Sequence, residues 1–172
     1  MNRGKNIERK YSLFALAAHE LAHWVLCKEQ SIETYDGFYT EMVDNDNICQ
    51  GLTIFDDKTP DDKCAKIYIA GIAADYIIQA DCDDDFFDYA FDQSTVYWEG
   101  LGADLPGDLK RYCDYMHNPA KAEIIAAIKD MALHLQSSRW LSILQEQVRP
   151  KIARMAYSRL DIGKVNYFKL TW

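Results

Sequence analysis

The sequence predicts a mainly α-helical fold with a small β-sheet of two or three short strands. Most of the 172 residues lie in segments of strong helix formers with apolar residues at helical spacing. Residues 31–57 differ, because β-branched and aromatic residues there surround Gly37 and Gly51 in a pattern typical of short strands. No internal repeat or low-complexity linker divides the sequence, so we expect one domain over residues 1–172.

The first predicted helix covers residues 7–28 and is apolar on most sides, as expected of a helix inside a core. The strands should follow this helix, one of them over residues 51–55, with an asparagine-rich turn at 44–47. A second helix is expected from residue 60 to about residue 79, with Thr59 as its cap and Pro60 as its first residue. Its many small residues allow another helix to approach closely.

The remaining segments predict more helices. One begins near 104–108 and ends near 117, another begins at 118–119, and a final long helix covers about 138–160. Residues 164–168 form either a strand or an extended tail. The acidic and aromatic segment 81–92 lacks the ligand spacing and glycine of an EF-hand loop, so we interpret it as a solvated acidic loop.

Charge and composition exclude several function classes. The chain has 27 acidic against 19 basic residues and a net charge of −8, which disfavours binding to nucleic acids or anionic membranes. No apolar run approaches the roughly 20 residues of a membrane span. The first 18 residues resemble a signal peptide, but cleavage there would destroy the motif described next, so we expect a cytoplasmic protein. The five cysteines are scattered without a C-x-x-C pair, which predicts free thiols.

The first helix contains the motif HExxH at His19, Glu20 and His23. A helix places residues four apart on one face, so both imidazoles can occupy adjacent vertices of a zinc tetrahedron. Glu20 then lies close enough to take a proton from a water on that metal. A surface helix with incidental histidines is the competing interpretation. The apolar flanks disfavour it, because buried histidines need partners.

A catalytic zinc site has three protein ligands and one open position. The third histidine of the HExxHxxGxxH pattern is absent after His23. His117 and His134 lie far downstream in ordinary helical sequence, where a structural role is the simpler interpretation. A carboxylate is therefore expected as the third ligand.

Three segments in order resemble the peptidase domain of the FtsH-type proteases: AAHELAHWVL, YIAGIAADYII and GLGADLPGDLKRY. The resemblance covers about residues 10–118. It implies that His19 and His23 bind zinc, that Glu20 is the catalytic glutamate, and that Asp108 is the third ligand. Asp104 is the rival for that role, because Asp104-Leu105 is also an aspartate followed by a leucine, although its distance from Gly102 is shorter than the family's.

The chain departs from the family at several points. Ala22 replaces the glycine before the second histidine, and Asp75 stands at the position of the family's glutamate, where a supporting role is more plausible than ligation. Asp108 lies two residues further from Gly102 than the family spacing. The sequence has no GxxxxGK[ST] loop and neither the ATPase module nor the membrane anchor. The resemblance thus implies a related zinc site and ATP-independent chemistry.

These patterns leave three hypotheses open. The first is a zinc metallopeptidase that hydrolyses a peptide or protein substrate. The second is a site-specific regulatory peptidase that cleaves one partner protein, such as a repressor. The third is a non-catalytic zinc-binding interaction module that keeps the site without turnover. A homo-oligomer or a separate partner protein is compatible with each. An open coordination position reached by a cleft would distinguish the enzymes from the module.

Overall fold

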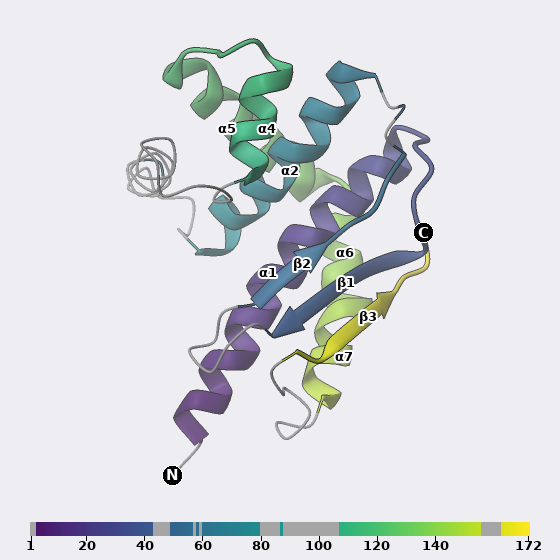
Figure 1. Cartoon of the computed structure of the whole chain (residues 1–172). Helices are drawn as coiled ribbons and strands as arrows, with labels where there is room; N and C mark the ends of the chain where they lie inside the picture. Colours follow the sequence, from purple (N-terminus) through teal and green to yellow (C-terminus); the bar gives the residue numbers. More distant parts are fainter. Residues whose placement is uncertain are drawn as a thin grey trace.

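The computed structural model describes residues 3–42, 49–56, 58, 60–79, 87, 107–155 and 163–172. Over these residues the protein is mainly helical with one three-stranded antiparallel sheet, which confirms the predicted fold class (Figure 1). Several predicted features lie outside the described residues: the turn at 44–47, the Thr59 cap, the segment 81–92 except Phe87, and Asp104. No helix in the described ranges has the length and apolar character needed to cross a membrane.

The helices match the expected segments closely. They are α1 (Arg3–Glu29), α2 (Asp61–Gln79), α4 (Gly107–Tyr115), α5 (Lys121–Ser137), α6 (Trp140–Ile143) and α7 (Arg149–Arg154), with the π-helical segment η2 (Leu144–Val148) between the last two. One long helix was predicted over about 138–160. The structure instead divides this region into α6, η2 and α7 and ends α7 at Arg154, so the π-helical turn and the earlier end correct that prediction. Pro150 explains the π-helical turn, because a proline ring clashes with the carbonyl four residues earlier in a regular α-helix.

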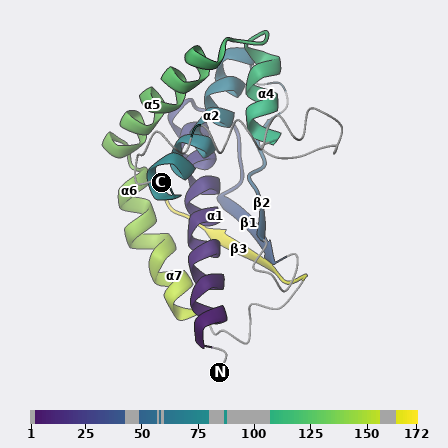
Figure 2. The ribbon, with the colours of Figure 1, turned by 90° about the vertical axis from the view of Figure 1, so that its left-hand side faces the viewer.

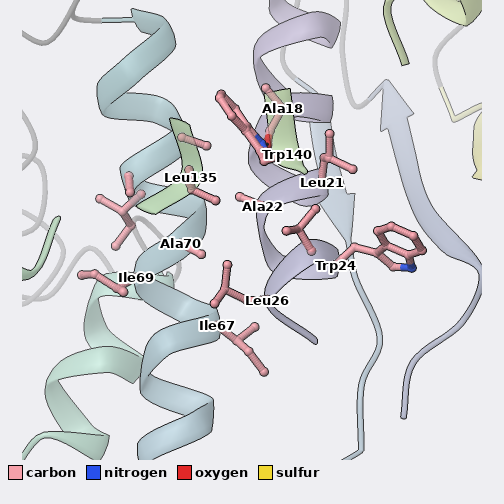
Figure 3. Close-up of a cluster of buried hydrophobic side chains, with 14 of the residues drawn as sticks. Ala18, Leu21, Ala22, Trp24, Leu26, Ile67, Ile69, Ala70, Leu135 and Trp140 are labelled. Atoms are coloured by element: carbon pink, nitrogen blue, oxygen red, sulfur yellow. The ribbon is translucent and has the colours of Figure 1, made fainter. Parts of the chain in front are cut away.

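The core forms where α1 and α2 lie side by side (Figure 3). Small residues such as Ala22 and Ala70 allow this close approach, and both are fully buried. Helix α5 packs on α2, and α6 contacts α1. Trp140 is fully buried in this core, and its indole Nε1–H donates to the carbonyl oxygen of Ala18 at 2.9 Å. Figure 2 shows the helices α5 to α7 on one side of α1 and the sheet on the other.

The sheet has the order β2-β1-β3, from β1 (Gly37–Met42), β2 (Cys49–Leu52) and β3 (Val165–Lys169). The segment predicted as either a strand or a tail is therefore a strand. β1 pairs antiparallel with both neighbours, and Phe38 lies opposite Phe168 with their rings stacked at 4.9 Å. Both rings are buried on the face toward α1, so the sheet is held against the helix that carries the HExxH motif.

Candidate metal centre

Residues His19, Glu20 and His23 form a group that can hold a metal ion. One ligand atom from each lies within 4.8 Å of the other two. The two Nε2 atoms are 3.0 Å apart, and the imidazole rings meet edge to face at 81°. His23 and Glu20 are each only 5% exposed although they are polar. The spacing within α1 thus produces the cluster that the sequence predicted.

Asp108, the second residue of α4, lies directly at this cluster. Its Oδ2 is 2.7 Å from His19 Nε2 and 3.0 Å from His23 Nε2. Two nitrogens and one oxygen therefore form a triangle with sides of 2.7–3.0 Å. A zinc ion forms bonds of about 2.0–2.2 Å to such atoms, so one ion can reach all three. The donor set fits the metal that the sequence implies.

The far side of each imidazole contacts α2. His23 Nδ1–H donates to the carbonyl oxygen of Ile67 at 2.7 Å, and His19 Nδ1–H donates to Asp75 Oδ2 at 2.9 Å. These contacts leave both Nε2 atoms directed at Asp108. A histidine that binds a metal usually donates its other ring N–H in this way, which sets its tautomer and orientation. Asp75 thus lies at the side of His19 away from the triangle.

The electrostatics of the cluster favour positive charge. Burial alone would lower the pKa of His19, but Asp75 and Asp108 outweigh it and raise that pKa well above 6.5. Burial would also lower the pKa of His23, but Asp108 outweighs this effect and raises that pKa. For Asp108, burial would raise the pKa, yet the two histidines hold it well below its ordinary value. The carboxylates therefore favour the protonated, positively charged form of both imidazoles.

Gly71 in α2 gives the histidines their space. A Cβ atom at this position would lie 2.5 Å from His23 Cε1 and 2.6 Å from both Nε2 atoms. Glycine in a helix interior costs about 0.5–1 kcal/mol relative to alanine. The close approach of α2 to the imidazoles, which any side chain would prevent, is the structural reason for glycine here.

Glu20 contacts Gly51 in β2 and Thr53, the residue directly after this strand. The hydroxyl of Thr53 donates to Glu20 Oε2 at 2.7 Å and lies 3.1 Å from the Glu20 carbonyl oxygen. A Cβ atom at Gly51 would lie 2.5–2.7 Å from the Glu20 side chain. Neither residue was predicted to belong to the site. A glycine inside a strand pattern does signal a close approach of this kind, but it does not identify the partner.

The other two described histidines lie elsewhere. His134 Nε2 pairs with Glu29 Oε2 at 2.6 Å, beside the end of α1. His117 is exposed in the turn after α4, with a φ of 58°. Neither side chain belongs to the cluster on α1, and the ion pair of His134 agrees with a structural role.

Comparison of the chain with models of protein families, with curated proteins and with solved structures found no match. Any functional assignment therefore depends on the geometry of the site and on the sequence patterns that led to it.

Proposed function

We propose that this chain is a zinc-dependent metallopeptidase in which His19, His23 and Asp108 hold the metal and Glu20 is the general base. The observation that carries the proposal is the position of Asp108 Oδ2, within 3.0 Å of both Nε2 atoms. Together with Glu20 this gives two histidines, one carboxylate ligand and a separate carboxylate base. Such a donor set leaves the fourth position of a tetrahedral zinc ion for water or substrate.

Each side chain has a role in this proposal. When bound, zinc supplies a Lewis acid that acidifies water and polarises a peptide carbonyl. Glu20 takes the proton of the attacking water and passes it to the amine that leaves. The Thr53 hydroxyl holds Glu20 Oε2, so the carboxylate keeps one orientation during the transfer. Asp75 and the carbonyl of Ile67 keep both imidazoles facing the metal.

The resemblance to the peptidase domain of FtsH-type proteases supports the same proposal. Its three segments correspond to the HExxH helix α1, the helix α2 with Asp75, and the start of α4 with Asp108. These elements contact one another, as α1 packs on α2 and α2 packs on α4. The substrate class that follows is a peptide or protein.

Metal content is the first test. Protein purified without added metal should contain about one zinc ion per chain by plasma emission. The double variant His19→Ala, His23→Ala should contain none, because two of three ligands are lost. His134→Ala is the matched control and should keep the metal, since His134 pairs with Glu29. Full zinc occupancy in the double variant would contradict the assignment.

The third ligand is tested by comparing Asp75→Asn, Asp104→Asn and Asp108→Asn in competition with a chelator. Asp108→Asn should weaken zinc affinity by several orders of magnitude. Asp75→Asn should lower zinc affinity by about 10–100-fold, as for other residues that hydrogen-bond to metal-binding histidines. A parent-like affinity of Asp108→Asn with a large loss for Asp104→Asn would transfer the ligand role to Asp104.

The catalytic role of Glu20 is tested with Glu20→Gln. The amide cannot accept a proton, so this variant should keep its zinc and lose the cleavage of a peptide library that the parent performs. A zinc-loaded parent that cleaves no peptide or protein in the library would favour the non-catalytic interaction module.

A further inference from the structure

The two oxygens of the Asp108 carboxylate have different neighbours. Oδ2 faces the two histidines, whereas Oδ1 lies 3.9 Å from Nη1 of Arg111. Arg111 is three residues further along α4, so one helical turn places its side chain beside the carboxylate. The guanidinium thus interacts with the oxygen that does not face the histidines.

Aromatic side chains hold Arg111 in this position although it is 58% exposed. Its guanidinium carbon lies 5.6 Å from the centre of the Tyr68 ring, in a cation–π contact. Tyr68 in turn stacks on Tyr115 and meets the edge of Phe55, both at 5.8 Å. Tyr68 also directly follows Ile67, whose carbonyl holds His23. One part of α2 therefore positions both a histidine and the arginine.

We propose that Arg111 is a positioning residue that keeps Asp108 a one-oxygen ligand of the metal. This inference rests on the proposed metal site. A carboxylate can bind a metal through one oxygen or both. A cation held at Oδ1 stabilises negative charge on that oxygen and keeps it turned away from the metal. Coordination by one oxygen leaves room for water or substrate, so Arg111 acts on the chemistry through Asp108.

Cobalt(II) in place of zinc tests the inference, because its visible absorption is stronger with four ligands than with five. The variants are Arg111→Gln, Arg111→Lys and, as matched control, Lys110→Gln, which removes the same charge from the adjacent exposed position of α4. Arg111→Gln should show weaker absorption and about tenfold weaker cobalt affinity. Lys110→Gln should match the parent.

Arg111→Lys separates charge from shape. A parent-like spectrum would assign the effect to the positive charge at Oδ1. A spectrum like that of Arg111→Gln would assign it to the planar guanidinium, and either result supports the inference if Lys110→Gln is unchanged. An Arg111→Gln protein with the parent's spectrum and affinity would overturn it, as would equal losses in Arg111→Gln and Lys110→Gln. Failure of the parent to bind cobalt would instead refute the metal site itself.

Discussion

The absence of a side chain at Gly71 determines how closely α2 can approach the two histidines. Gly71→Ala would place a methyl group 2.5–2.6 Å from three ring atoms of His19 and His23. The rings must then leave their present positions, so we expect zinc affinity to fall by about 100-fold while the helices stay folded. Chelator competition measures the affinity, and circular dichroism measures the helix content.

Gly107→Ala is the matched control for this substitution. A Cβ atom at Gly107 would meet nothing closer than 3.8 Å, although this residue adjoins Asp108. Its zinc affinity should equal that of the parent. Unchanged affinity in Gly71→Ala would show that the imidazoles can shift and still bind the metal.

Thr53 provides a second prediction at the scale of single residues. Thr53→Val keeps the shape of the side chain but removes the hydroxyl that donates to the buried Glu20 carboxylate. The free energy of unfolding should fall by about 1–3 kcal/mol, as for other buried charged groups that lose a hydrogen bond. Thr53→Ser keeps the hydroxyl donor, so its free energy of unfolding should fall by less. Urea denaturation measures both, and equal midpoints for Thr53→Val and the parent would contradict the prediction.

The sequence identified those site residues whose relation is local. His19, Glu20 and His23 were predicted because helical geometry alone brings them together. Asp108 was named through the family resemblance, since nothing local connects it with residues 89 positions earlier. The supporting residues Gly51, Thr53, Gly71 and Arg111 escaped prediction. Their roles arise only when α2 and β2 pack on α1 and α4 packs on α2.

At the scale of elements, the end of α1 has an unfavourable residue. Ser31 follows this helix with a φ of 55°, in the left-handed region that glycine adopts most easily. The amide of Ile32 donates to the carbonyl oxygen of Cys27 at 2.8 Å, which completes the helix end. Ser31→Gly should raise the free energy of unfolding by about 1 kcal/mol, because the Cβ atom no longer opposes this conformation.

Ser31→Ala serves as the control, because it removes the hydroxyl and keeps the Cβ atom. Its stability in thermal unfolding should be close to that of the parent. If glycine and alanine shift the melting temperature equally, the effect comes from the hydroxyl and the backbone argument is wrong.

The elements themselves were largely predictable. A run of helix formers indicated α1, and helix-start residues indicated α2, α4 and α5 near their observed starts, because these signals are local in the sequence. One feature required tertiary information. β3 was predicted as either a strand or a tail, since its state depends on pairing with β1. The π-helical segment η2 was missed, although Pro150 provided a local reason to expect an irregular turn.

For the whole molecule, the proposed metal connects α1 with α4 through side chains that are 85 to 89 positions apart. An ion that binds only the folded chain stabilises it by RT ln(1 + [L]/Kd), which is about 4 kcal/mol at 1,000 times Kd. Treatment with a chelator should therefore lower the melting temperature, and added zinc should restore it. The variant His19→Ala, His23→Ala should melt at one temperature under both conditions. A zinc-dependent shift in that variant would indicate a different binding site.

The order of strands in the sheet affects how the chain folds during its synthesis. β1 and β2 are close in the sequence, so we expect them to pair early and to bring Thr53 to Glu20. Its other neighbour is β3, where Gly37 pairs with Lys169, and such distant pairing has a large entropic cost of loop closure. Until β3 emerges, one edge of β1 stays unpaired and Phe38 lacks its stacking partner Phe168. An unpaired strand edge is a site of association between chains. We therefore expect association between chains to be most favourable in the interval between the synthesis of β2 and that of β3.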